Sequence, residues 1–180
     1  MDNSSRERTI EAFWLLNDFI EDLITGTRAF EYFDTTKFKA GATDQILRSY
    51  NKMADSFIFL TLAKWIEFYD HYRMVIPPEQ QMTCKQLRNE LVARGVNDFR
   101  NKVVGHIWST KHNRPLFPSE IENLDKRITG GDGSTFLRWI NDPGNNRFGT
   151  TVVGTSEAVR DEIKKKWALS EQELLPSTWQ

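Results

Sequence analysis

Three residues that are suited to phosphate chemistry lie close together in the stretch Asp98–Trp108. Arg100 and Asn101 are adjacent, and His106 follows six residues after the arginine. A histidine with an ordinary pKa of about 6.5 can take up and release protons at neutral pH. An arginine presents a planar fork of N–H donors that matches phosphate oxygens, and an asparagine can orient a neighbouring group by hydrogen bonding. These residue types suit cleavage of an RNA phosphodiester without a metal.

The expected reaction uses the RNA's own 2′-hydroxyl as the nucleophile. A base removes the proton of this hydroxyl, its oxygen attacks the adjacent phosphorus, and a cation stabilises the charge on the phosphoryl oxygens. The products are a 2′,3′-cyclic phosphate and a 5′-hydroxyl. In this reaction we expect Arg100 to hold the phosphate, His106 to be the general acid or base, and Asn101 to orient the substrate or the histidine.

The spacing between Arg100 and His106 places a condition on the site. Six residues along one straight α-helix leave two side chains roughly 120° apart around the axis. The two side chains share a face only if the helix bends near Gly105, or if a second copy of the chain completes the site. A symmetric dimer would bring two arginines and two histidines into one cleft. The sequence therefore predicts a homodimer.

Four further residues flank the proposed cleft as candidate substrate-binding groups. They are Lys102, Lys111, His112 and Arg114. For the turn around His112 a solvated loop is an equally good interpretation. Arg100 and His106 also have a structural interpretation, in which the arginine is solvated on an outer helix face and the histidine is a core residue bonded to a backbone carbonyl.

Apolar residues at helical spacing dominate the first half of the chain. Ser4–Glu7 has the spacing of a capping box, and we expect a helix from there to Gly26, with a short continuation over Arg28–Phe33. After a loop over Thr35–Gly41, Thr43 can cap a long helix that Pro77 and Pro78 stop. Its apolar face comprises Ile46, Leu47, Tyr50, Met53, Ala54, Phe57, Ile58, Thr61, Leu62, Trp65, Ile66 and Tyr69. The rings of Phe57, Trp65 and Tyr69 are expected in the core or in a dimer seam.

Shorter helices are expected in the second half. A capping box at Thr83–Gln86 predicts a third helix with Leu87, Leu91 and Val92 buried. Gly95 breaks it, and Asn97 can cap a fourth helix that carries Arg100 and His106. A fifth helix opens at Pro118 with Ile121, Leu124 and Ile128 inward, a short one runs from Ser134 to Ile140, and a last one starts at Ser156 with Val159, Ile163 and Trp167 on one face.

These elements predict an all-α fold, because no alternating strand pattern repeats. We expect an up-down helical bundle of four to five main helices with extra short C-terminal helices. The chain of 180 residues is long enough for one domain with a full core. We expect residues 1–180 to form a single domain, with a core bundle over 5–130 and an extension over 131–180 that packs on it.

Composition and charge exclude several classes of protein. The formal net charge of −1 argues against a general nucleic-acid coater, although a local basic cleft is compatible with it. Cys84 is the single cysteine, so neither an internal disulfide nor a thiolate zinc cage can form. No two histidines have the one-turn spacing that binds a metal on a helix, and we expect no metal and no cofactor. Without a signal peptide or a membrane-spanning run, the expected location is the cytoplasm.

The stretch Arg100–His106 resembles the Arg-x4-6-His motif of the HEPN superfamily, in the form that has Asn after the Arg. The resemblance covers residues 5 to 130, and the motif lies late in the bundle, as it does in that family. Ile107-Trp108-Ser109 and Arg114-Pro115-Leu116 are similar to a bacterial subset related to abortive-infection proteins.

The resemblance implies an all-α homodimer in which Arg100, Asn101 and His106 line a composite cleft at the interface. It further implies a metal-independent endoribonuclease of the bacterial defence or toxin type, acting on RNA and restrained by an antitoxin or another regulatory protein. Two alternatives stay open. One is a catalytically silent module of the same fold that binds a nucleotide or a protein, and the other is a structural homodimer without an active site.

Overall fold

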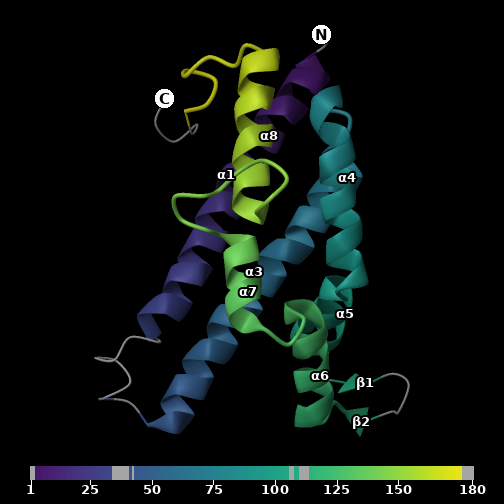
Figure 1. Cartoon of the computed structure of the whole chain (residues 1–180). Coiled ribbons are helices and arrows are strands. Elements are labelled where there is room, and N and C mark those ends of the chain that lie inside the picture. The colour runs from purple at the N-terminus through teal and green to yellow at the C-terminus, as the bar shows by residue number, and fades with distance from the viewer. Residues whose placement is uncertain (1–2, 34–40, 42, 106–107, 110–113, 176–180) are drawn as a thin grey trace.

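The computed structural model describes residues 3–33, 41, 43–105, 108–109 and 114–175. Its elements are α1 (Asn3–Phe33), α3 (Asp44–Tyr72), α4 (Pro78–Ala93), α5 (Val96–Phe99), the π-helix η1 (Arg100–Gly105), β1 (Trp108–Ser109), β2 (Arg114–Pro115), α6 (Pro118–Thr129), α7 (Gly133–Ile140) and α8 (Val152–Lys166). Figure 1 shows α1 and α3 running the length of the molecule, with α4 and α8 alongside them and α6 and the strands at one end. The predicted all-α bundle is confirmed, and the two short strands form one antiparallel pair.

The pair formed by α1 and α3 is the main contact of the bundle. Gly26, which we expected to end the first helix, lies inside α1. It is buried where α3 crosses, because a Cβ at this position would lie 2.6 Å from Cγ1 of Ile58. The glycine therefore allows two helices to approach closely, and the helix continues to Phe33.

The observed starts of the next two helices agree only in part with those predicted from the sequence. Thr43 caps α3 as expected, since its hydroxyl accepts a hydrogen bond from the backbone N–H of Ile46. The helix α4, however, begins at Pro78 and not at Thr83. A proline at the first helical position loses no hydrogen bond, so Pro78 can start α4, whereas α3 already ends at Tyr72. In α4, Leu87 and Leu91 are buried as predicted, whereas Val92 is exposed.

Large rings fill the core between α3 and the shorter helices. The ring of Phe59 meets Phe99 edge-on with centroids 4.8 Å apart, and it meets Phe136 at 5.9 Å. Trp65 is fully buried and stacks on Tyr69. Such edge-on and stacked pairs add to the burial of apolar area. Among the described residues, no helix combines the length and apolar composition needed to cross a membrane.

Residues beyond 130 contribute to this core. Ile140, Val159 and Ile163 are fully buried, and α8 packs along α1. The expected cap of the last helix is wrong, because Thr151 caps α8 and Ser156 lies inside it. Similarly, Asp132 and not Ser134 caps α7. The helix α8 starts one turn earlier than a cap at Ser156 would indicate. Burial of Val152 and Val153 outweighs the lower helix propensity of these β-branched residues.

The chain after α8 folds back onto the start of α1. Glu173 accepts two hydrogen bonds of 2.8 Å from the guanidinium of Arg6. Hydrogen bonds from the backbone and hydroxyl of Ser170, with the contact to Arg6, lower the pKa of Glu173 to about 2. Leu174 is buried beside this ion pair. The segment after α8 is therefore held by charge and by burial together.

We predict that Ser156→Ala destabilises the fold by about 1–3 kcal/mol, the cost of leaving a buried donor unpaired. Ser156 is fully buried, and its hydroxyl accepts a hydrogen bond of 3.0 Å from the indole N–H of Trp65 in α3. Urea denaturation measures the change. The control is Ser119→Ala on exposed surface. Equal stability of the two variants would contradict the role of this bond.

Candidate functional site

A break in the helical path precedes the predicted site. Gly95 adopts a left-handed conformation with φ of 83°, so the chain turns sharply between α4 and α5. The regular helix expected to carry Arg100 is not formed. One α-helical turn is instead followed by the π-helix η1, which starts at Arg100. Single turns of π-helix occur often at functional sites.

Arg127 of α6 holds this break in place. Its guanidinium donates hydrogen bonds of 3.3 and 3.0 Å to the carbonyl of Ala93 at the end of α4. It also pairs with Asp98 at 3.2 Å, and it packs 3.1 Å from the point where a Cβ on Gly95 would lie. The start of α5 is thus fixed from three sides, which fixes the position of the residues that follow.

Arg100 is held at the surface by two side chains. Its guanidinium forms an ion pair with Glu67 of α3, and its Nε donates a hydrogen bond of 3.2 Å to Oδ1 of Asn101. The side chains of Arg100 and Glu67 are 35% and 53% exposed. A guanidinium has five N–H groups. Within the described part of the chain, its partners are the carboxylate of Glu67 and the amide oxygen of Asn101.

The other predicted residues fall into two groups. His106, Lys111 and His112 lie outside the described residues. Lys102 is exposed and lies 3.8 Å from Asp98. Arg114 forms a two-pronged ion pair with Glu120 at 2.7 and 3.2 Å and lies over the ring of Phe117. Arg114 therefore ties β2 to the start of α6, which is a structural role.

Glu67 is the residue that the sequence interpretation missed. It lies 33 positions before Arg100, and no local spacing links the two. The only signal is its place in α3, where it continues the apolar face as an exposed acid. His71 follows Glu67 by one helical turn and is exposed on the same face of α3.

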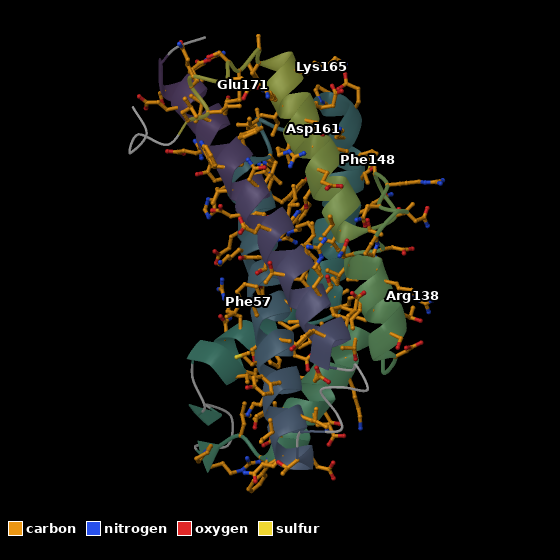
Figure 2. All side chains as sticks on the ribbon, turned by 90° about the vertical axis from the view of Figure 1, so that its left-hand side faces the viewer. Phe57, Arg138, Phe148, Asp161, Lys165 and Glu171 are labelled. Atoms are coloured by element: carbon orange, nitrogen blue, oxygen red, sulfur yellow. The ribbon has the colours of Figure 1, made fainter. Side chains whose placement is uncertain are left out.

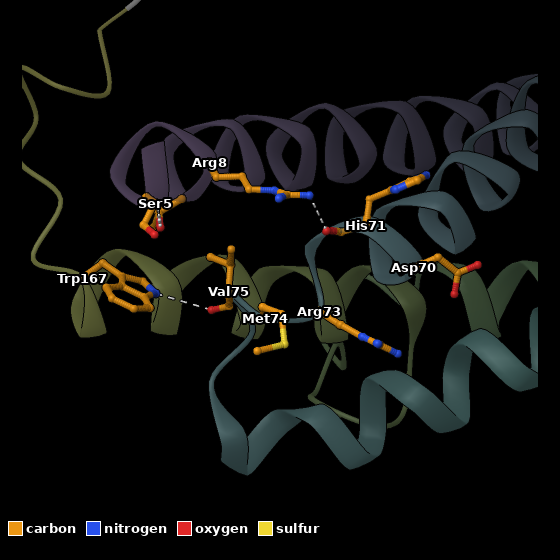
Figure 3. Close-up of a pocket in the computed structure, with 9 residues that line it drawn as sticks. Ser5, Arg8, Asp70, His71, Arg73, Met74, Val75 and Trp167 are labelled. Atoms are coloured by element: carbon orange, nitrogen blue, oxygen red, sulfur yellow. Dashed lines mark hydrogen bonds between the residues drawn. The ribbon is translucent and has the colours of Figure 1, made fainter. Parts of the chain in front are cut away.

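A separate cavity of about 370 Å³ lies where the start of α1 meets the end of α3. Figure 3 shows the guanidinium of Arg8 reaching the carbonyl of His71, and the indole of Trp167 reaching the carbonyl of Val75, at 3.0 and 3.4 Å. The side chain of Arg73 extends away from Arg8 in the same view. The two arginines do not converge, so this cavity lacks the focused positive charge of a phosphate site.

Burial strongly raises the pKa of two titratable groups in the fold. Burial raises the pKa of the Cys84 thiol to about 12, so the thiol stays protonated at neutral pH and is a poor nucleophile. Burial, together with the nearby charge of Asp125 in α6, raises the pKa of Asp55 in α3 to about 7. Neither group contacts Arg100 in the described part of the structure.

Comparison with known proteins gives information on the fold but not on the function. No family model matches the chain, and no curated protein matches its sequence. The structure is similar to that of an integron cassette protein from the mobile metagenome of V. paracholerae, with a TM-score of 0.76 and 21% sequence identity. The match covers 91% of this chain and 99% of that chain. At this identity the likeness shows a shared fold alone.

We predict that Asp55 makes the fold less stable as the pH rises. Because its pKa is higher in the folded state, the folded chain holds this proton up to about pH 7, whereas an unfolded aspartate loses it near its ordinary value. The stabilisation of the folded state by the protonated Asp55 is complete below the pKa of the unfolded chain and is lost as the pH rises through 7. The expected result is that Asp55→Asn reduces the fall in melting temperature between pH 5 and pH 8.

The matched control is Glu21→Gln, an exposed acid on α1. The control should show the same fall as the wild type. An Asp55→Asn variant with an unchanged fall would mean that folding does not raise the pKa of this carboxyl.

Proposed function

We propose that the chain is a HEPN-like, metal-independent endoribonuclease that works as a homodimer. The observation that carries the proposal is the placement of Arg100, which is half-exposed, aligned by Glu67 and Asn101, and located in a π-helical turn just before His106. A preorganised guanidinium can stabilise the charge that develops on phosphoryl oxygens in the transition state. The resemblance of the Arg-Asn-x4-His stretch to the HEPN motif supports the same assignment.

In the proposed reaction, Arg100 binds the non-bridging oxygens of the scissile phosphate. The His106 of the second copy takes the proton of the 2′-hydroxyl while the oxygen bonds to phosphorus. The bond from phosphorus to the 5′ oxygen breaks, and the 5′ oxygen takes a proton from water. Asn101 orients Arg100, and Lys102, which is exposed and lies 3.8 Å from Asp98, is a second candidate for a phosphate contact.

The biological setting that we propose is bacterial defence, with activity restrained by an antitoxin or another regulatory protein. This setting follows from the resemblance to abortive-infection proteins. The structural neighbour is described as an integron cassette protein of a mobile metagenome, which is compatible with a gene that moves between hosts.

One observation favours a second candidate, a silent binding module of the same fold. The ion pair between Arg100 and Glu67 already satisfies part of the arginine's charge. A phosphate must then share the guanidinium with a carboxylate, which weakens binding unless the carboxylate serves to position the arginine. RNA binding without cleavage is the result that separates this candidate from the ribonuclease.

We predict that purified protein cleaves RNA in EDTA and leaves 2′,3′-cyclic phosphate ends. Arg100→Ala should lower the rate by about 10²–10³-fold and His106→Ala by about 10²–10⁴-fold. The readouts are a gel assay, mass spectrometry of the product ends and circular dichroism to check the fold. Arg28→Ala, which replaces an exposed arginine on α1, is the matched control.

Full cleavage by both site variants would contradict the assignment. Loss of cleavage in His71→Ala but not in His106→Ala would reassign the proton-transfer role to His71.

We predict that Glu67 acts as a positioning residue. Glu67→Ala should lower kcat on the order of 10- to 100-fold, because a misplaced arginine no longer meets the transition state. KM should stay the same or fall, since RNA no longer competes with a carboxylate for Arg100. Glu67→Gln, which keeps the hydrogen-bond acceptor, should recover part of the rate. An effect on KM alone would contradict this role.

A further inference from the structure

A small polar cavity is lined by residues of α4, α7, α8 and the loop before α8, and it takes no part in the proposed chemistry. Its volume is about 140 Å³, and its lining combines one aromatic ring with hydroxyl, amide and carboxylate groups. A cavity of about 150 Å³ can hold benzene, so this one has room for a single six-membered ring. Figure 2 shows Phe148, the residue before Gly149 of the lining, on the same side of the molecule as Arg138 of α7.

Three polar side chains of the lining follow one another along α4. Thr83, Gln86 and Glu90 are spaced by three and four residues, so they share one face of the helix at intervals of about 5–6 Å. In the part of the chain that the structure describes, four groups of the lining make no hydrogen bond. They are the side chains of Thr83 and Gln86, the Oε2 atom of Glu90 and the indole N–H of Trp139 in α7. These groups can therefore exchange water for a ligand.

Arg94 holds two parts of this lining in a fixed relation. It lies one turn after Glu90, and its guanidinium donates hydrogen bonds of 3.1 and 2.8 Å to Oε1 of that residue. The same guanidinium lies over the ring of Trp139, with 4.5 Å to the centroid. A hydrogen bond of 2.8 Å to the carbonyl of Ile128 anchors it to α6. The carboxylate and the indole are thus positioned in advance, which lowers the cost of binding a rigid ligand.

The rest of the lining is satisfied within the chain or is apolar. Thr151 donates a hydrogen bond to the side chain of Asn146, and Thr155 donates one to the carbonyl of Thr151. Thr155 also accepts a hydrogen bond from the backbone N–H of Gly149. Leu87 is buried and gives the cavity an apolar surface. These residues shape the cavity, and recognition of a ligand falls to the four groups named above.

The edge of a cytosine base matches these four groups. Cytosine has an amino group that donates, next to two atoms that accept, N3 and O2. Oε2 of Glu90 can accept from the amino group, as carboxylates do when they read cytosine. Gln86 and Thr83 can donate to N3 and O2, and the indole N–H of Trp139 is a third donor. Uracil carries an oxygen in place of the amino group, so it would set two acceptors against each other at Glu90.

We propose that this cavity binds one unpaired cytosine of the RNA substrate. The choice of RNA as the ligand rests on the proposed function, since proteins read unpaired RNA bases with aromatic rings and polar side chains. Arg100 follows the end of α4 by seven residues. Arg127 fixes the turn between them, because it bonds both the carbonyl of Ala93 and the carboxylate of Asp98. A base held in the cavity therefore places the RNA strand in a constant relation to Arg100.

Titration with free nucleosides tests the cavity without cleavage. The readout is the NMR signal of the Trp139 indole N–H, which is identified by its loss in Trp139→Phe. We expect cytidine to shift this signal in a saturable way and to bind on the order of 10-fold more tightly than uridine. Glu90→Gln keeps the oxygen that Arg94 needs and adds a donor for uracil, so it should abolish or reverse this preference. Glu79→Gln, at an exposed acid of α4 outside the cavity, should retain it.

Three results would overturn the proposal. The first is no saturable shift with cytidine, and the second is equal affinity for the two nucleosides or a full preference in Glu90→Gln. The third is the same shift with ribose alone, which would mean that the sugar binds and not the base. Because nucleoside binding is read without cleavage, a chain that prefers cytidine but does not cleave RNA contradicts the ribonuclease and leaves the base pocket in place.

Discussion

The edge-on contact between Phe59 of α3 and Phe99 of α5 determines where the proposed site lies. Phe99 is buried and directly precedes Arg100, so its ring fixes the start of η1 against the long helix. The contact is held from the other side by Arg127, which ties the end of α4 to Asp98. With the backbone fixed in this way, Arg100 can reach Glu67 from a defined position. A flexible arginine would lose this preorganisation, which is the property that the proposed chemistry needs.

Much of the fold could be predicted from helical periodicity, because burial of one face is the strongest signal that a helix leaves in its sequence. The cap at Thr43 and the break at Gly95 were both visible for local chemical reasons. The errors came from tertiary packing. Glycine is a residue type that often ends a helix, but Gly26 instead allows Ile58 to approach closely. Serine is a residue type that often caps a helix, but Ser156 instead accepts a hydrogen bond from Trp65. In the site, Arg100 and Asn101 could be selected by type and spacing. Glu67 could not, since only the folded chain brings it to the arginine.

The ion pair of Arg100 has a consequence for regulation. An arginine neutralised by a carboxylate favours a resting state of low affinity for RNA. In the proposed homodimer, the second copy brings its own arginine and histidine to the cleft. Assembly and activity would then be coupled, because the proposed cleft is complete only in the dimer.

The central claim is that Arg100 of one copy and His106 of the other act on the same phosphate. The most direct measurement is a complementation assay, in which inactive Arg100→Ala and inactive His106→Ala dimers are mixed, dissociated, reassociated and tested on RNA in EDTA. A mixed dimer contains one cleft with both wild-type residues, so we predict that cleavage returns after exchange and that neither variant cleaves alone. Mixed dimers that form but remain inactive would contradict a composite site.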